Sequence, residues 1–303
     1  MDPLNLKTVA EHWGSDASTV GYYGNGYHWV EHPQVLAYIH EQMSGHAGMS
    51  WDFHFWKRYI EPQKRGLKVL SLGCGCGNLE ISLMKRGGIS ELIAYDIADG
   101  ALDVAKKAAI QADVKIEFCK ANLNELVLPV DSFDVVVASS SLHHVEMLEP
   151  LFFQIYRSLR RGGLMAINEY IGPSRFQFAP YQVDLINYLH GLLPDRYRWR
   201  RSDPAVLKVA IDFPSVEFLQ LHDPSEAIRS DEIVPLLKNY FKVVEDRPFG
   251  GTLLHFLLQD IAGNFDPSCS HDCLLMNLLI YSERSLIDAA ALSSDFTYMV
   301  LAK

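Results

Sequence analysis

The sequence lacks an excess of basic residues, long hydrophobic runs and an export signal. Its 27 lysines and arginines are outnumbered by 37 aspartates and glutamates, which gives a formal net charge of −10. A general nucleic-acid binder needs a basic face that releases counterions from phosphates, so we expect no nucleic-acid partner. No stretch reaches the roughly 18 consecutive apolar residues that a membrane-spanning helix needs. The first three residues, Met-Asp-Pro, lack the basic flank and apolar stretch of a signal peptide.

Cysteine is scarce as well: the chain has five, an odd number, and two of them stand inside a glycine-rich loop. We therefore expect no disulfide framework and a reducing, cytoplasmic setting. The composition that remains is that of a folded protein, since 49% of the 303 residues are hydrophobic and 21% are charged. This length fits one large domain, or one domain with an elaborated cap.

Short runs rich in β-forming residues alternate with longer helical patterns between residues 66 and 171, the predicted α/β core. The predicted strands are 68–72, 92–95, 115–119, 133–138 and 164–169, and the predicted helices are 79–86, 101–111 and 149–160. A basic residue and two glycines at 161–163 are expected to end the last of these helices. The alternation predicts βαβ units and a mostly parallel sheet.

Three further segments surround this core. Residues 1–65 are predicted to form a helical N-terminal lid, with one helix at 33–43. Between residues 172 and 230 prolines punctuate short helices, and we interpret this stretch as an insertion that caps the carboxyl edge of the sheet. Residues 231–303 are expected to complete the sheet. The elements predicted there are a helix at 231–239, a strand at 241–246, helices at 253–264 and 271–292, and a strand at 296–302.

The strongest motif follows the first predicted strand. Glycine stands at every second position of the loop 73–77, Gly-Cys-Gly-Cys-Gly, and a helix follows. Glycines let a backbone turn sharply and approach a ligand closely, and the helix offers unpaired N–H groups in its first turn. Asp96 lies 19 residues after Gly77, at the end of the next predicted strand, where an acid can accept both hydroxyls of a ribose. The pattern predicts a site for a nucleoside cofactor.

Two kinds of cofactor use this arrangement. A dinucleotide site requires the pattern G-x-G-x-x-G, but the sixth position counted from Gly73 is Asn78. The tighter G-x-G-x-G pattern resembles motif I of the class I S-adenosylmethionine-dependent methyltransferases. The resemblance continues through residues 121–134 and through 159–164, Leu-Arg-Arg-Gly-Gly-Leu. Residues 139–145, Ser-Ser-Ser-Leu-His-His-Val, are similar to the loop after strand four of the ubiquinone- and menaquinone-type methyltransferases.

This resemblance, which covers residues 67–170, implies a doubly wound, Rossmann-like α/β fold with a seven-stranded sheet whose last strand is antiparallel. It implies S-adenosylmethionine as the cofactor and S-adenosylhomocysteine as the product. Asp96 would hold the ribose, and Ser139 would border the sulfonium. Asn122 departs from the family's common aspartate and would meet the adenine as a neutral partner. The positions that the resemblance places on the cofactor are Gly73, Cys74, Gly75, Gly77, Asp96, Ile97, Asn122, Leu123 and Ser139.

Candidates for proton removal stand at the ends of the fourth and fifth predicted strands. Methyl transfer from a sulfonium is an in-line displacement, in which the enzyme positions donor and acceptor and can remove a proton from the acceptor. His143 or His144 is placed to act as the general base. The alternative is that this pair packs on the cofactor or caps the next helix. Glu169 and Tyr170 also point to the acceptor side, where a carboxylate could accept a proton or orient a hydroxyl.

Basic and aromatic residues are candidates for the acceptor's entrance. Arg175, six residues beyond the fifth predicted strand, is placed at the mouth of the site and favours an anionic acceptor. The basic run 195–201 could do the same, but a solvated helix or loop face is the favoured interpretation. The aromatic residues before the helix at 33–43 form either a lid that excludes water or a staple onto the sheet, and neighbouring glycines favour the lid. These lid candidates are Tyr22, Tyr23, Tyr27 and Trp29, of which Tyr22 and Tyr27, with Tyr170 and Arg175, are expected to contact the acceptor.

We expect no metal ion. The polar segment 222–232 invites a metal interpretation, but helix caps at Ser225 and Ser230 explain it. The Cys-x-His-x-Cys segment at 269–273 has no second pair to complete four ligands, so the start of a helix is favoured. The two cysteines of the glycine loop are interpreted as small residues rather than nucleophiles, because the motif places no base beside them.

These observations predict a methyltransferase that acts on oxygen of a small natural product, sugar or lipid-like compound. Oxygen is preferred to nitrogen or carbon because histidine and glutamate are available, and because the Asn/Asp-Pro-Pro-Tyr motif of amide or base nitrogen methylation is absent. Two alternatives stay open: a cofactor-binding sensor or scaffold without activity, and an NAD-dependent oxidoreductase. The sequence predicts neither the acceptor's identity nor the oligomeric state.

Overall fold

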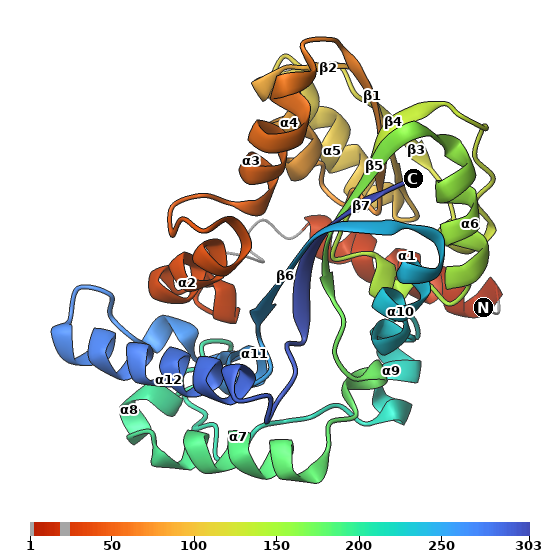
Figure 1. The fold of residues 1–303 in the computed structure, drawn as a ribbon. Helices are drawn as coiled ribbons and strands as arrows, with labels where there is room; N and C mark the ends of the chain where they lie inside the picture. Colours follow the sequence, from red (N-terminus) through yellow and green to blue (C-terminus); the bar gives the residue numbers. More distant parts are fainter. Residues whose placement is uncertain (1–2, 19–24) are drawn as a thin grey trace.

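A central sheet organises the computed structural model, which describes residues 3–18 and 25–303. Within these residues the sheet has seven strands in the order β3-β2-β1-β4-β5-β7-β6. Their bounds are β1 Leu67–Leu72, β2 Ile89–Asp96, β3 Glu117–Lys120, β4 Phe133–Ser139, β5 Leu159–Tyr170, β6 Lys242–Gly250 and β7 Phe296–Ala302. The strands β1 to β5 pair in parallel, whereas β7 lies antiparallel between β5 and β6 (Figure 1). The predicted doubly wound α/β fold with an antiparallel last strand is confirmed.

Helices cover both faces of this sheet because its central strands are apolar on both sides. Along β1, Val69 belongs to the core on one face and Leu70 to the core on the other. The helices of the first face are α2 Pro33–Ser44, α3 Trp51–Phe55, α4 Asn78–Arg86 and α5 Asp99–Gln111, and those of the second are α6 Leu148–Ser158 and α10 Ile233–Tyr240 (Figure 1). Five of these six helices confirm predicted ones, with ends that differ by a residue or two, and α3 was not predicted.

The helix α1 Pro3–Ser18 lies against α5. Their backbones approach closely at two glycines, because a Cβ on Gly100 would lie only 2.5 Å from the carbonyl oxygen of Gly14. This contact holds α1 against α5, and Trp13, the residue before Gly14, contacts the ring of His144 in the loop after β4.

Short helices fill the segment between β5 and α10. They are α7 Pro180–Leu192, α8 Asp195–Arg198 and α9 Val216–His222. Two helices from the C-terminal part of the chain, α11 Leu254–Leu258 and α12 Ser270–Asp288, gather with α7 and α8 on the same side of the molecule (Figure 1). None of the helices that the structure describes is both long and apolar enough to span a membrane.

Three predicted helix ends are wrong, and one of them is that of α12, which ends at Asp288 rather than at residue 292. The helix predicted for 253–264 is interrupted, because α11 ends at Leu258 and Asp260 has a positive φ of 64°, which an α-helix does not accommodate. The helix α6 ends at Ser158 rather than at residue 160, because β5 begins at once with Leu159. The two glycines expected to stop that helix instead lie in a bulge of β5, where the register with β4 shifts.

The cysteines and the start of α12 agree with the prediction. All five cysteines carry free thiols. Cys269 is the N-cap residue of α12, so the 269–273 segment is a helix start.

A buried carboxyl group makes the stability of the fold depend on pH. Asp295 stands just before β7 with one carboxylate oxygen that has no hydrogen-bond partner, and burial raises its pKa to about 8, with the charge of Glu283 adding to the rise. The unfolded chain ionises at a lower pH, so the free energy of unfolding falls as pH rises from about 4 to about 8. We expect Asp295→Asn to stabilise the protein by about 2–3 kcal/mol more at pH 9 than at pH 6.

Urea unfolding at the two pH values measures this difference. Asp288→Asn, at an exposed aspartate on α12 that pairs with Arg284, is the matched control and should change the unfolding free energy little at either pH. Equal stabilisation by Asp295→Asn at both pH values would show that Asp295 does not titrate in this range.

Candidate active site

The carboxyl ends of β1, β2, β4 and β5 meet at one edge of the sheet, at the point where the strand order reverses between β1 and β4. The glycine loop leaves β1 there. Gly73, Gly75 and Gly77 all have positive φ values, of 68°, 50° and 77°. The N–H groups of Gly73 and Cys74 donate to the carbonyl oxygen of Tyr95, at 2.8 and 3.0 Å, which ties the loop to the end of β2. The backbone conformation itself therefore calls for glycine.

The three glycines differ in what surrounds them. A Cβ on Gly73 would lie 2.3 Å from the Cβ of Ser141, so this glycine makes room for the loop that follows β4. A Cβ on Gly77 would touch Ala105 and Phe118, each at 3.0 Å. Gly75 has no atom within 4 Å of the position that a Cβ would take. The middle glycine therefore faces open space at the centre of the site.

Asp96 ends β2 directly beside Gly75. Its two carboxylate oxygens accept N–H groups from Gly75 and Ala98, at 2.8 and 2.9 Å. Each oxygen keeps a further lone pair with which it can accept a hydroxyl. Burial raises the pKa of this carboxyl, while the backbone N–H groups that it accepts act in the opposite direction. Ile97, which follows, is half-buried.

The remaining predicted cofactor positions lie along the same edge. The carbonyl oxygen of Asp96 accepts the N–H of Ala121 at 2.8 Å, which brings the segment after β3 to this point. Asn122 caps a short helical turn, since its side-chain oxygen accepts the N–H of Asn124 at 3.0 Å. Leu123 packs against the core, and the Ser139 hydroxyl accepts a hydrogen bond from the Asn168 amide at 3.2 Å. The structure thus brings these positions near Asp96 and the end of β4.

Glu169, on β5, holds the loop after β4 in place. One of its oxygens accepts the N–H groups of Ser141 and Leu142, at 2.9 and 2.8 Å. The other accepts the N–H of Tyr170 at 2.9 Å and pairs with Nδ1 of His143. Glu169 is only 1% exposed, so its carboxylate orients groups of the protein itself. Its predicted contact with an acceptor stays a prediction.

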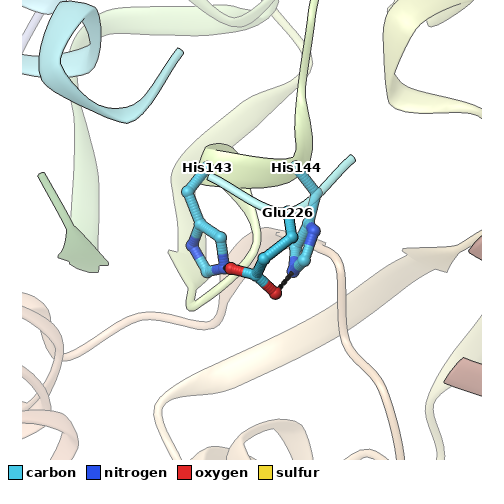
Figure 2. A group of neighbouring side chains, drawn as sticks. All are labelled: His143, His144 and Glu226. Carbon is cyan, nitrogen blue, oxygen red and sulfur yellow. Dashed lines mark ion pairs between the residues drawn. The ribbon is translucent and has the colours of Figure 1, made fainter. Parts of the chain in front are cut away.

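Two histidines and a glutamate meet beside this carboxylate, with the glutamate between the imidazole rings (Figure 2). Nε2 of His143 lies 3.6 Å from Oε1 of Glu226, and Nε2 of His144 lies 4.0 Å from Oε2. The centroids of the two imidazole rings are 4.1 Å apart. On its other side, Nδ1 of His144 lies 3.0 Å from the hydroxyl of Ser225, which donates to Asp223 at 2.7 Å.

The surroundings shift the pKa values of the two histidines in opposite directions. Burial acts to lower the pKa of His143, but the charge and hydrogen bond of Glu169 outweigh it and raise this pKa to about 9. Burial, together with the charge of His143, lowers the pKa of His144 well below its ordinary value. At neutral pH His143 is therefore a positively charged imidazolium paired with Glu169, while His144 is neutral and keeps a lone pair.

Arg175 and Tyr170 make hydrogen bonds within the fold. The Arg175 guanidinium donates to the carbonyl oxygens of Pro224 and Glu226, at 2.7 and 3.0 Å, and so fixes the loop that carries Glu226. The Tyr170 hydroxyl donates to the carbonyl oxygen of Pro173 at 3.0 Å. Both side chains stand next to the histidine pair, and their contact with an acceptor stays a prediction.

The other entrance candidates are divided between core and surface. Trp29 is 4% exposed and packs beside Phe296, so it belongs to the core. Tyr27 is half-buried, and its carbonyl oxygen accepts the N–H of Asp260 at 2.6 Å. Tyr22 and Tyr23 lie outside the described residues. Three of the four arginines in the basic run 195–201 pair with acids: Arg196 with Asp272, Arg198 with Asp195, and Arg200 with Asp212 and Asp260. The fourth, Arg201, donates to the carbonyl oxygen of Asn25 at 3.1 Å.

The interpretation of segment 222–232 as helix caps is wrong. The Ser225 hydroxyl donates to Asp223, and no helix begins there; the Ser230 hydroxyl donates to the carbonyl oxygen of Gly172 at 2.9 Å. The sequence shows this polar segment but does not connect Glu226 with the histidines. It also does not indicate Trp13, whose ring meets the ring of His144 edge to face and whose Nε1–H donates to Asp223 at 3.1 Å.

Comparisons with known proteins agree with the geometry. A family described as a methyltransferase domain matches residues 70–167. The chain is similar to a ubiquinone/menaquinone biosynthesis C-methyltransferase of Cronobacter sakazakii, 29% identical over 190 residues that cover 60% of this chain and 72% of that protein. It is also similar to a ubiquinone biosynthesis O-methyltransferase of Azorhizobium caulinodans, 28% identical over 190 residues that cover 62% of this chain and 71% of that one.

A solved structure shows the same fold over nearly the whole chain. It is a geranyl diphosphate C-methyltransferase of Streptomyces coelicolor in complex with Mg²⁺, geranyl diphosphate and S-adenosylhomocysteine. The match has a TM-score of 0.52 at 12% identity and covers 98% of this chain and 96% of that chain.

Proposed function

Since the chain is a class I S-adenosylmethionine-dependent methyltransferase that acts on small molecules, we propose that it methylates a hydroxyl oxygen of its acceptor. The observation that carries this proposal is the group of buried His143 and Glu169 with half-buried His144 and Glu226 at the carboxyl edge of β4 and β5. A hydroxyl is a poor nucleophile until its proton is removed, and this group supplies the means of removing it.

The residues around the glycine loop fit S-adenosylmethionine. Gly75 leaves open space, and Asp96 keeps lone pairs for two ribose hydroxyls. When bound, this cofactor supplies a methyl group made electrophilic by the sulfonium. We propose that the glycine loop lies along its methionine end and that Asp96 holds the ribose. The other proposed contacts are Cys74 in the loop, Ile97, Asn122 and Leu123 at the adenine, and Ser139 near the sulfonium.

The histidine pair is proposed to face the acceptor's hydroxyl. His144 is neutral and offers a lone pair on Nε2, and the carboxylate of Glu226, 4.0 Å away, stabilises the positive charge that arrives with a proton. Glu169 acts through His143, because it fixes the orientation of that ring and of the loop that carries both histidines. We therefore assign Glu169 a positioning role.

Aromatic rings next to the histidines favour an acceptor that has an apolar part. The ring of Tyr170 lies 5.0 Å from that of Phe176, 5.2 Å from Phe296 and 6.3 Å from His255. Such surfaces suit a natural product or a lipid-like compound. Tyr170 and Tyr27 are proposed to contact the acceptor, and an anionic group on it would meet Arg175.

We expect Asp96→Asn to weaken the binding of S-adenosylhomocysteine about 10- to 100-fold, because hydrogen bonds between a hydroxyl and a charged carboxylate are stronger than those to an amide. Calorimetric titration measures the change. The matched control is Asp99→Asn, three residues later on the exposed start of α5, where the carboxylate pairs with Lys120. Unchanged affinity in Asp96→Asn, or tighter binding of NAD than of S-adenosylhomocysteine by the wild-type protein, would contradict the cofactor assignment.

Incubation with cofactor labelled in its methyl group, together with metabolite extracts of the source organism, tests the proposed function. The labelled product is isolated, and NMR identifies the atom that carries the methyl group. We expect a methyl ether or ester of a small acceptor. A label on carbon or nitrogen would refute oxygen as the site of methylation, and the absence of any labelled small molecule would refute the acceptor class.

A further inference from the structure

Three side chains of the active site aim their ligand atoms at a common point. One nitrogen each of His143 and His144 and one carboxylate oxygen of Glu226 lie within 4.8 Å of one another (Figure 2). Bonds of about 2.0–2.2 Å at tetrahedral angles would place two ligand atoms about 3.4 Å apart. The separations from Nε2 of the histidines to the Glu226 oxygens are 3.6 and 4.0 Å. These two separations run to different oxygens of Glu226. Binding of one cation by one oxygen and both imidazoles would therefore draw the three ligand atoms, which lie within 4.8 Å of one another, together by up to about 1.4 Å.

The Nδ1 atoms of both histidines already have hydrogen-bond partners. Nδ1 of His143 pairs with Glu169, and Nδ1 of His144 lies 3.0 Å from the hydroxyl of Ser225. Because that hydroxyl donates to Asp223, its oxygen accepts from the imidazole. Both rings then carry a proton on Nδ1 and turn Nε2 toward Glu226. Nε2 of His144 offers a lone pair directly, and a bound cation would displace the proton from Nε2 of His143. This is the arrangement in which protein imidazoles bind metals, with a carboxylate or similar group behind each ring.

The charge and the backbone of the site favour a cation as well. Three carboxylates, those of Glu169, Asp223 and Glu226, surround the histidines, against the single guanidinium of Arg175. The N–H of Ile228 donates to the carbonyl oxygen of His143 at 3.0 Å, so the loop with Glu226 is tied to the histidines. The ligand side chains are 10%, 16% and 19% exposed, which leaves room for small ligands from solvent.

We propose that His143, His144 and Glu226 bind one divalent transition-metal cation. Two imidazoles and one carboxylate favour Zn²⁺, Fe²⁺, Co²⁺ or Mn²⁺ over Mg²⁺, which prefers oxygen ligands alone. A hydroxyl bound to such a cation loses its proton to solvent water more readily. With the cation bound, the histidines would therefore promote proton removal as its ligands, in place of the direct proton transfer to His144 proposed for the protein without a cation. That chemical consequence rests on the proposed function, whereas cation binding does not.

Titration of the EDTA-treated full-length protein with Co²⁺, followed by its visible d–d absorption, tests the proposal without cofactor or acceptor. We expect saturation at one equivalent, without the charge-transfer band of thiolate ligation. Magnesium in excess should not displace the cobalt. Glu226→Gln and His144→Asn should each weaken binding at least about tenfold. The asparagine amide at 144 keeps a donor toward Ser225 but lacks Nε2. His222→Asn, at an exposed histidine four residues from Glu226, is the matched control and should bind like the wild type.

The wild-type titration keeps the proposal testable even if a variant fails to fold, which circular dichroism would show. Absence of a Co²⁺ spectrum in the wild-type protein would overturn the proposal, as would equal affinity in folded Glu226→Gln and His144→Asn. Methyl transfer that survives EDTA in a protein without cobalt binding would refute the cation and leave the proposed function standing. Cobalt binding without methylation of any acceptor would support the cation site and refute the proposed function.

Discussion

Replacement of Gly73 with alanine is expected to destabilise the protein by about 2–4 kcal/mol and to abolish cofactor binding. The new Cβ would lie 2.3 Å from the Cβ of Ser141 and 2.9 Å from its hydroxyl oxygen, distances that no relaxed contact reaches. The φ of 68° adds the strain of a left-handed conformation. Because Ser141 also donates to the carbonyl oxygen of Leu72 at 2.9 Å and is fixed by Glu169, it cannot move aside.

Gly75→Ala is the matched control for this prediction. Its φ of 50° is also positive, but no atom lies within 4 Å of the new Cβ. We expect a loss of about 1 kcal/mol in stability, together with weak binding of S-adenosylhomocysteine, because the methyl group points into the proposed cofactor space. The double change Gly73→Ala/Ser141→Gly should recover part of the lost stability. Urea unfolding and calorimetry measure both effects, and equal stability of the two alanine variants would contradict the steric argument.

The part of the site that the sequence predicts best is the part encoded by local backbone chemistry. A strand, three alternating glycines and a helix specify the loop, and the acid at the end of the following strand is fixed by the parallel register of β1 and β2. The loop and Asp96 therefore lie together as expected, with the Gly75 N–H on the carboxylate. Interactions of this kind need only neighbouring elements in an ordinary βαβ unit.

The acceptor side could not be predicted in the same way. Glu226 stands 82 residues after His144, in a loop without regular structure, and it reaches the histidines through backbone contacts of Arg175 and Ile228. Trp13 arrives from the other end of the chain, on a helix positioned by the contact of Gly14 with Gly100. The local periodicity of the sequence does not predict such long-range contacts. They depend on how irregular segments pack over the sheet.

Glu169 shows how a correct position can have an unexpected role. At the end of β5 the sequence predicts a group that meets the acceptor, and the strand does place it at the active edge. However, the loop after β4 turns back over it, with a positive φ of 49° at Ser140, and presents backbone N–H groups to its carboxylate. The N–H groups of that loop therefore use the hydrogen-bond acceptors of Glu169. Sequence patterns do not reveal this interaction.

Glu169→Gln is expected to lower kcat about a hundredfold or more, and to reduce stability by about 2–4 kcal/mol. The carboxylate accepts from four groups, two on each oxygen. An amide keeps one accepting oxygen, so its NH₂ group must face two donors whichever way it turns. Either the N–H groups of Ser141 and Leu142 or those of Tyr170 and His143 lose their partner in a buried place.

His143→Asn separates the two effects of this change. The asparagine amide can still donate to Glu169 as Nδ1 does, so the loop keeps its support, but the variant has no counterpart of Nε2. We expect stability close to that of the wild type and a fall in kcat with little change in KM for the cofactor, measured with the acceptor that the labelling experiment identifies. The glutamine variant should lose both stability and kcat. If His143→Asn folds and retains full kcat, His143 takes no part in proton removal, and catalysis depends on His144 or on positioning of the acceptor alone.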